Sequence, residues 1–255
     1  ATTEIYTLSL HDALPIYLLG ATPRWEDIFR DLDAPRDVTD TLFQAVETQI
    51  EAKPRICVTA LLGPAGSGKS TILRRLAVRL SQSGRLTFVT NSEGLPDPRI
   101  VAEALGHLPD RAVILFDNAE VALGYLPDII DATRHLAHTP IMIVACRPNE
   151  YDRRAAQLQR LVDIDECDVP DLNRAEICSV IRVLERNGLL GYLQGLSDSQ
   201  RIYEFESRER AGKQLLVAMK EATTGKGFDE IIENEFASLP TPGARLLYLF
   251  IALAT

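Results

Sequence analysis

An eight-residue stretch in the first third of the chain has the composition of a phosphate-binding loop. The stretch from Gly63 to Ser70, GPAGSGKS, fits the pattern G-x-x-x-x-G-K-[ST], and it stands between an apolar β-rich run and a helical one. Glycines allow several backbone N–H groups to converge on one anion, and the positive end of the following helix dipole adds to the attraction. The pattern therefore predicts a site for the phosphate groups of a nucleotide.

The residues of this loop divide into charged, hydroxyl and backbone contributors. We expect Lys69 to contact the β- and γ-phosphates as a point charge, and Ser70 to offer its hydroxyl to Mg²⁺. The expected ligands are ATP or ADP together with Mg²⁺. The loop residues predicted to surround the nucleotide are Gly63, Pro64, Ala65, Gly66, Ser67, Gly68, Lys69, Ser70 and Thr71.

An acidic residue follows a second apolar run, AVILF, which ends at Phe116. A buried parallel strand brings such a residue to the carboxyl edge of the sheet, beside the phosphate loop. We therefore predict that Asp117 and Ser70 hold Mg²⁺. The next position is Asn118 rather than a second acid, and Glu120 follows two residues later. Glu120 either polarises the attacking water or caps the next element, and the sequence leaves both roles open.

A third apolar run, residues 140–146, is followed directly by a basic residue, Arg147. We predict that this run is an extra strand between the strands that carry the phosphate loop and Asp117. Arg147 would then stand where it can contact a γ-phosphate, although a surface ion pair is the alternative. The predicted catalytic residues are Lys69, Asp117, Glu120 and Arg147.

The elements that must position these residues alternate between strand and helix. Strands are expected at 55–62, 85–90, 112–116 and 141–146, with a further short one near 161–164; helices are expected from residue 40 and at 70–80, 99–106 and 127–137. Strands that are apolar throughout and alternate with helices predict a parallel sheet covered on both faces. The expected fold class is α/β, a three-layer P-loop NTPase.

The pattern becomes purely helical after residue 168. Asn173 is the predicted N-cap of a helix, and Glu176 completes the capping box. Further helices are expected at 208–221 and 228–237, and the Thr241-Pro242 pair is suited to start an apolar helix over 244–254. We therefore expect an α-helical subdomain to follow the sheet.

The first 16 residues and the overall charge bear on the class of protein. Residues 1–16, ATTEIYTLSLHDALPI, match the translation of a common sequencing adapter and are expected to be an artefact. The net charge is −9, or −7 without them, since 34 acidic residues then stand against 27 basic ones. This balance disfavours a general nucleic-acid binder. No apolar run approaches the ~20 residues that cross a bilayer, so we expect a cytoplasmic protein and no membrane partner.

Residues 17–255 resemble the NTPase module of bacterial signal-transduction ATPases with numerous domains, the STAND class. The resemblance rests on GPAGSGKST, VILFDN and IMIVACRP at the three strand ends, on YLLGATPRWEDIFRDLDAPR before them, and on DVPDLNRAEI and ERAGKQLLVAMKEATTG after them. It implies a leading segment near the adenine at 17–52, an NTPase core at 53–168, a helical lid at 169–239 and a truncated winged helix at 240–255. In the leading segment, Trp25 would contact the adenine; packing against the sheet is its alternative role.

The resemblance also implies a function. Proteins of this class are switches in which ADP holds a closed monomer, while ATP binding permits a homo-oligomer that activates an attached effector. Several resemble antiphage defence sensors. We therefore expect an ATP-binding, slowly hydrolysing switch module whose effector and sensor domains lie outside this sequence, and the amide at Asn118 fits slow turnover. The alternative is an AAA+ or initiator-like ATPase associated with DNA, which would share the core, lid and winged helix.

Overall fold

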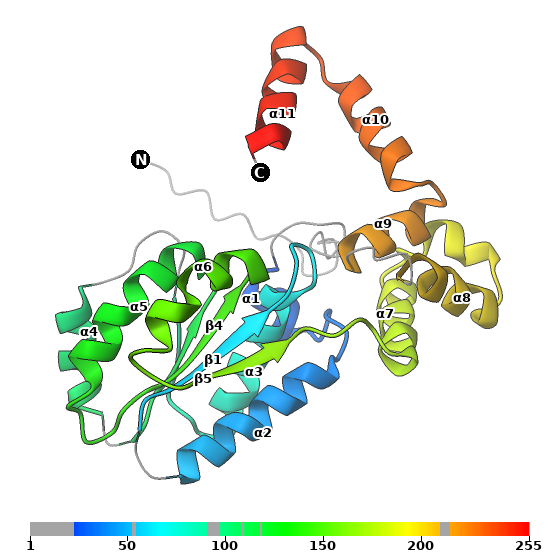
Figure 1. Cartoon of the computed structure of the whole chain (residues 1–255). Helices are drawn as coiled ribbons and strands as arrows, with labels where there is room; N and C mark the ends of the chain where they lie inside the picture. Colours follow the sequence, from blue (N-terminus) through cyan, green and yellow to red (C-terminus); the bar gives the residue numbers. More distant parts are fainter. Residues whose placement is uncertain are drawn as a thin grey trace, which may run out of the picture.

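A five-stranded parallel sheet forms the centre of the protein (Figure 1). The computed structural model describes residues 23–52, 55–90, 97–108, 110–117, 119–209 and 215–254, so the segment 1–16 and Asn118 lie outside the described residues. The strands are β1 (Cys57–Leu62), β2 (Thr87–Thr90), β3 (Val113–Phe116), β4 (Ile141–Cys146) and β5 (Ile164–Asp168). Their order is β2-β3-β4-β1-β5. The predicted position of β4, between the strands that lead to the phosphate loop and to Asp117, is confirmed.

Helices cover both faces of this sheet, which confirms the predicted three-layer α/β fold. On one face lie α2 (Asp37–Glu51) and α3 (Lys69–Gln82); on the other lie α4 (Pro98–Gly106), α5 (Ala119–Thr133) and α6 (Pro148–Leu158). Alternate side chains of each central strand pack against the helices on opposite faces of the sheet. Val144 packs toward α5 and α6, for example, and Ile143 and Ala145 pack toward α2 and α3. The central strands are apolar throughout because both faces are buried.

Several elements differ from the sequence prediction; α2, for example, begins at Asp37 and not at residue 40. Helix α5 begins at Ala119 and continues through Pro127, which had indicated a helix start; burial of Leu123 and Leu126 against the sheet stabilises the turns before the proline. Helix α6 was not predicted, because Tyr151 and Leu158 are its only fully buried residues. Strand β5 begins at Ile164, where pairing with β1 starts, and not near residue 161.

The lid has a hydrophobic core of its own. It comprises α7 (Arg174–Arg186), the 3-10 helix η2 (Gly191–Gly195), α8 (Asp198–Glu209) and α9 (Leu215–Thr224), which pack around the fully buried Phe205 and Leu193. The predicted cap of α7 is confirmed: the Asn173 side chain accepts hydrogen bonds from the backbone of Ala175 and Glu176, and Glu176 bonds back to the Asn173 N–H. Of the predicted helix at 208–221, residues 208–209 belong to α8, residues 215–221 belong to α9, and residues 210–214 lie outside the described residues.

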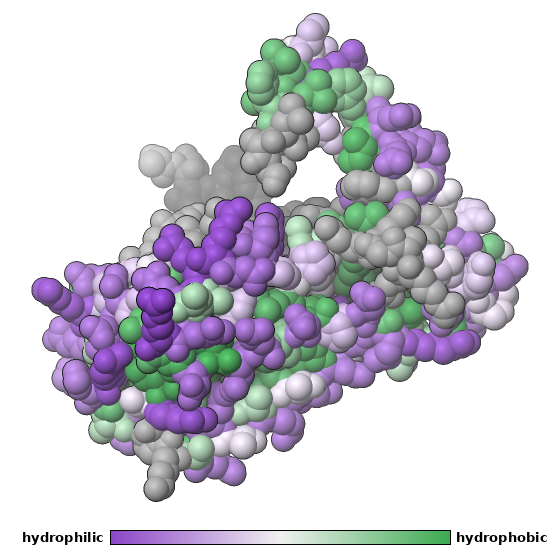
Figure 2. All heavy atoms as spheres, in the orientation of Figure 1, coloured by the Kyte–Doolittle hydropathy of each residue, from purple (hydrophilic) through white to green (hydrophobic). Residues whose placement is uncertain are grey.

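Two further helices follow the lid: α10 (Phe228–Ser238) leads away from it, and α11 (Pro242–Ala254) turns back toward the rest of the molecule (Figure 1). Both agree with the predicted helical runs, and the winged helix itself stays a prediction. Among the described side chains of α11, the exposed apolar ones include Leu246, Leu247, Leu249 and Phe250, and Figure 2 shows hydrophobic surface on this part of the molecule. None of the helices in the described part of the chain is long and apolar enough to cross a membrane.

The lid begins beside the phosphate loop. The last residues of β1 and β5, Leu62 and Asp168, are register partners, and the Val169 N–H donates to the Leu62 carbonyl at 2.7 Å. A Cβ on Gly63 would lie 3.2 Å from the Val169 side chain, so the two chain segments are in close contact there. The connection into the lid and the connection into the loop therefore leave the sheet side by side.

Candidate functional site

The backbone of the loop turns at two glycines before helix α3 starts. Gly66 has φ +73° and Gly68 has φ +90°, both in the left-handed region that side chains disfavour. Gly68 is the N-cap of α3, so the loop leads directly into the N-terminal end of the helix. Ser67 is buried, whereas Pro64 and Ala65 are exposed. The predicted strand, loop and helix thus occur in the order that an anion cradle needs.

Lys69 is bound to the loop that precedes it. Its Nζ atom donates to the carbonyl oxygens of Gly63 and Pro64, each at 2.7 Å. Burial lowers the pKa of Lys69, and the positive charge of Arg147 lowers it further, while nearby acidic groups including Asp117 oppose the change. The ammonium is therefore a partly desolvated charge held at the loop, and such a charge favours a phosphate partner.

Ser70 and Asp117 are brought together as predicted. The Ser70 Oγ atom donates to Asp117 Oδ1 at 2.8 Å, across the gap between the first turn of α3 and the end of β3. A hydroxyl and a carboxylate are hard oxygen ligands of the kind that Mg²⁺ prefers. The donor set therefore fits a magnesium ion, and Ser70 and Asp117 are the residues that would hold it.

Arg147 lies at the end of β4, close enough to Lys69 for its charge to affect the lysine pKa. Its side chain is half exposed, and its Nε atom lies 3.6 Å from Glu150 Oε1; the Glu150 carboxylate also accepts a hydrogen bond from the Arg147 N–H, at the N-cap of α6. Burial raises the pKa of the adjacent Cys146 to about 12, so this residue stays a thiol and supplies no nucleophile. The geometry leaves Arg147 near the phosphate end of the site, with part of its charge neutralised by Glu150.

Glu120 falls in the first turn of α5, which begins at Ala119. Its side chain lies outside the described residues. Both roles considered for Glu120, water activation and helix capping, therefore stay predictions.

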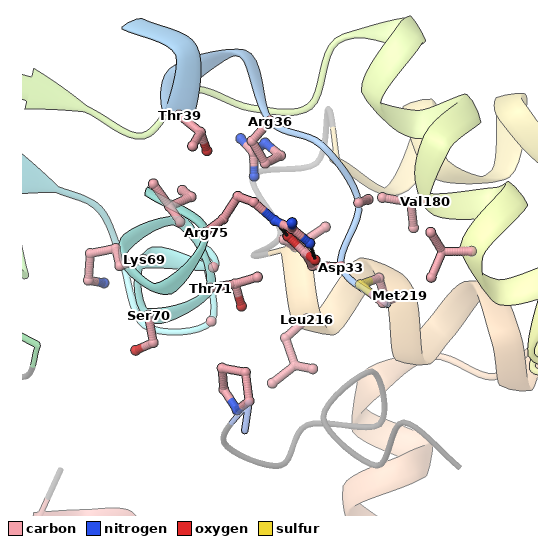
Figure 3. A pocket seen from close by; sticks show the side chains of 17 residues that line it. Asp33, Arg36, Thr39, Lys69, Ser70, Thr71, Arg75, Val180, Leu216 and Met219 are labelled. Atoms are coloured by element: carbon pink, nitrogen blue, oxygen red, sulfur yellow. Dashed lines mark hydrogen bonds and ion pairs between the residues drawn. The ribbon is translucent and has the colours of Figure 1, made fainter. Parts of the chain in front are cut away.

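A pocket of about 350 Å³ extends from the loop toward the lid (Figure 3). At one end lie residues of the loop and the start of α3, including Lys69 and Thr71; at the other end lie apolar side chains of the lid. The lining residues are Pro23, Asp33, Ala34, Arg36, Thr39, Gly66, Gly68, Lys69, Ser70, Thr71, Ile72, Arg75, Val180, Val183, Leu215, Leu216 and Met219. The charged end suits phosphates and the apolar end suits a flat heterocyclic base.

The lid contacts the loop directly at this pocket. The backbone N–H of Leu216, in the first turn of α9, donates to the Gly66 carbonyl at 3.2 Å. The Leu215 side chain lies 3.6 Å from the position that a Cβ on Gly68 would take. The helical lid is therefore packed against the loop in this structure.

The segment before α2 joins α3 to the lid through two ion pairs. Asp33 pairs with Arg75 of α3, which also binds Asp31, and these contacts raise the pKa of Arg75. Arg36 forms a buried pair with Glu176 of α7, at 3.1 Å between Nε and Oε1. Sequence reasoning missed these residues, because each pair joins positions far apart in the chain.

Trp25 lies in α1 (Trp25–Phe29) and is absent from the lining of the pocket. Its ring lies 5.8 Å from the guanidinium carbon of Arg74, and Arg74 in turn reaches Asp117. The structure therefore links Trp25 to Asp117 only through Arg74, while Pro23 lines the pocket instead. Sequence reasoning also missed Arg74; its position one turn after Ser70 on the same helix could have indicated it.

The loop, the adjacent Ser70–Asp117 pair and the parallel sheet define a P-loop NTPase. Residues 16–159, more than half of the chain, match the family described as novel STAND NTPase 5. The chain therefore belongs to the STAND class of P-loop NTPases, which confirms the resemblance found in its sequence.

Curated relatives and solved structures agree with this class. The hemin import ATP-binding protein HmuV of Vibrio anguillarum is 38% identical over 73 residues, which cover 28% of each chain. Its counterpart in Aliivibrio fischeri is 36% identical over 73 residues, with the same coverage. The chain thus spans about a quarter of these relatives. Hsp104 of S. cerevisiae in complex with casein is 14% identical, with a TM-score of 0.52 over 78% of this chain and 38% of that one, which shows a shared fold alone.

Proposed function

We propose that this chain is an ATP-binding, slowly hydrolysing switch module of a multidomain signalling or defence ATPase. The observation that carries the proposal is the pocket that lies between the core and the lid. Its phosphate end belongs to the loop, and its apolar end belongs to α7 and α9. A nucleotide in this pocket would contact both parts at once, so its identity can bias how they are arranged.

Several observations support ATP or ADP with Mg²⁺ as the ligand. The paired Ser70 and Asp117 oxygens fit the metal, and Lys69 is a desolvated charge beside the loop. The matched relatives are named as ATP-binding proteins. When bound, Mg²⁺ would neutralise phosphate charge and orient the terminal phosphate. Of the chain's own residues, Lys69 would bind phosphate, and we propose that Arg147 contacts the γ-phosphate.

The proposal divides the chain as its sequence suggests. Residues 17–52 lead into the pocket, residues 53–168 form the NTPase core, and residues 169–239 form the lid that contacts the nucleotide. In a longer protein, ATP would favour a homo-oligomer that activates an effector domain. The direct Leu216–Gly66 contact between lid and loop supports such coupling, because phosphate binding at the loop changes the surroundings of that carbonyl.

Calorimetry with ATP and ADP, with and without Mg²⁺, tests the proposal. We expect both nucleotides to bind, and we expect phosphate release slower than the ~1 s⁻¹ at the low end of typical enzymes. Asp117→Ala should weaken Mg²⁺-dependent binding while affecting metal-free binding less. Failure of both nucleotides to bind the folded protein would refute the proposal, and turnover at typical enzyme rates would refute the switch.

A further inference from the structure

Arg74 is a charged residue of the site whose role the sequence motifs do not explain. It lies one turn beyond Ser70 on α3, and its Nη2 atom is 3.6 Å from Asp117 Oδ2. The other carboxylate oxygen, Oδ1, accepts the Ser70 hydrogen bond. The Asp117 carboxylate therefore lies between a hydroxyl group and a guanidinium group. The expected metal ligands thus have a positive charge beside them.

The guanidinium of Arg74 is held less tightly than that of its neighbour Arg75. Arg75 donates to both Asp31 and Asp33. Arg74 lies over the ring of Trp25, and its Nη1 atom is buried with no hydrogen-bond partner among the described residues. A buried donor without a partner costs free energy. Arg74 is therefore not locked in position by a full set of hydrogen bonds, unlike Arg75.

We propose that Arg74 is a counter-ion of Asp117 that sets the Mg²⁺ concentration required by the nucleotide site. The proposal rests on the function proposed above, in which Ser70 and Asp117 hold the metal. Without metal, the guanidinium compensates the carboxylate charge, which would otherwise repel incoming phosphates. With metal, the same positive charge opposes the divalent cation. Arg74 thus favours entry of the nucleotide, and it raises the Mg²⁺ concentration at which the site is half-saturated. It is a positioning residue, because it acts through Asp117.

Trp25 makes this behaviour observable. It is the chain's single tryptophan, so intrinsic tryptophan fluorescence comes from one position. Because its ring contacts the Arg74 guanidinium, a shift of Arg74 away from Asp117 changes the surroundings of the ring. We therefore expect Trp25 fluorescence to respond when Mg²⁺ is added to the protein saturated with ADP.

The test is a titration of free Mg²⁺ into the whole chain saturated with ADP, followed by calorimetry and by Trp25 fluorescence. Arg74→Met keeps an unbranched stem against Trp25 and removes the charge. We expect it to lower the half-saturating Mg²⁺ concentration roughly three- to tenfold, because one repelling charge is lost. Arg74→Lys retains the charge and should keep a requirement near that of the parent.

Arg79→Met is the matched control. Arg79 lies on the same helix, contacts Asp40, and stacks on an aromatic ring, Phe43, at 4.7 Å. Its replacement removes the same charge from α3 at a distance from Asp117. We expect the Mg²⁺ requirement of this variant to match the parent. An equal shift in both methionine variants would assign the effect to net charge and overturn the proposal.

The remaining outcomes separate this proposal from the function on which it rests. If the parent binds neither ADP nor ATP, the proposed function is wrong and the role of Arg74 falls with it. If the parent binds nucleotide and Arg74→Met leaves the Mg²⁺ requirement unchanged or raises it, only the counter-ion role is overturned. Arg74→Gln provides a second neutral variant should the methionine variant fail to fold.

Discussion

The two ends of the pocket are built in different ways. The phosphate end consists of neighbours in sequence, Gly66, Gly68 and the first turn of α3, and Asp117 at the end of β3 hydrogen-bonds to Ser70 there. The lid end assembles residues from three distant segments, which include Asp33, Val180 and Met219. Backbone conformation fixes the first end, whereas packing and ion pairs between segments fix the second.

This difference predicts how the ends respond to substitution. Changes to the exposed or half-buried groups of the phosphate end, such as Lys69, should remove contacts to a ligand and leave the fold largely intact. Changes at the lid end remove contacts within the protein, so they affect stability first and affinity only through the arrangement of the lid. Separate measurements of the free energy of unfolding and of nucleotide affinity therefore test whether the two ends differ in this way.

The largest effect is expected at the buried pair of the lid end. Glu176→Gln leaves the Arg36 guanidinium buried without a charged partner and weakens the bonds from Asp37 and Asn173. Breaking such a pair should lower the free energy of unfolding by about 3–5 kcal/mol. Urea unfolding followed by circular dichroism measures it.

The matched control for this pair is Glu185→Gln. Glu185 is on the same helix and pairs with Arg201, but its side chain is 55% exposed. A loss of about 0–1 kcal/mol is expected there. Equal losses in the two variants would mean that the lid end does not depend on its buried ion pair.

A smaller effect in free energy, confined to binding, is expected at the phosphate end. Lys69→Ala removes the charge that would bind phosphate, and affinity for nucleotide should fall roughly 100-fold, or about 2.7 kcal/mol. The melting temperature should change little, because the bonds lost in the free protein go to loop carbonyls of Gly63 and Pro64. Calorimetry and thermal unfolding check the two parts. A variant that binds Mg·ATP as tightly as the parent would contradict the assigned phosphate site.

The smallest effect is a pH dependence of affinity. Burial and the Arg147 charge lower the pKa of Lys69, so its ammonium is lost at a lower pH than that of an ordinary lysine. The protonated form of Lys69 binds phosphate. The affinity for nucleotide is therefore highest below this pKa, and it declines as the pH rises through the pKa. We expect a loss of roughly tenfold or less, and we expect it to begin at a lower pH than the titration of an ordinary lysine, whose pKa is about 10.4.

The control for this pH dependence is Lys69→Arg. Arginine keeps its proton throughout the pH range in which a lysine titrates, so the variant should show a flat profile whatever its affinity. A parallel decline in both proteins would locate the titrating group elsewhere, for example on the nucleotide or at another residue of the site.

The sequence predicted the parts of the molecule that depend on local patterns. The central strands, the loop and the capping box of Asn173 and Glu176 follow from spacing and residue type over a few positions. The predicted meeting of Ser70 with Asp117 follows from the edge of a parallel sheet. Arg36 could not be predicted to pair with Glu176, because their 140-residue separation carries no local signal. Helix α6 escaped prediction because few of its residues are buried.

The adjoining exits of β1 and β5 have a mechanical consequence. Val169, where the chain leaves β5 for the lid, is joined to Leu62 by a hydrogen bond at the last residue before the loop. Any rotation of the lid about this hydrogen bond would therefore be centred next to the phosphate loop. Because displacement grows with distance from the centre of a rotation, the turn between α10 and α11 would move farther than α7 (Figure 1).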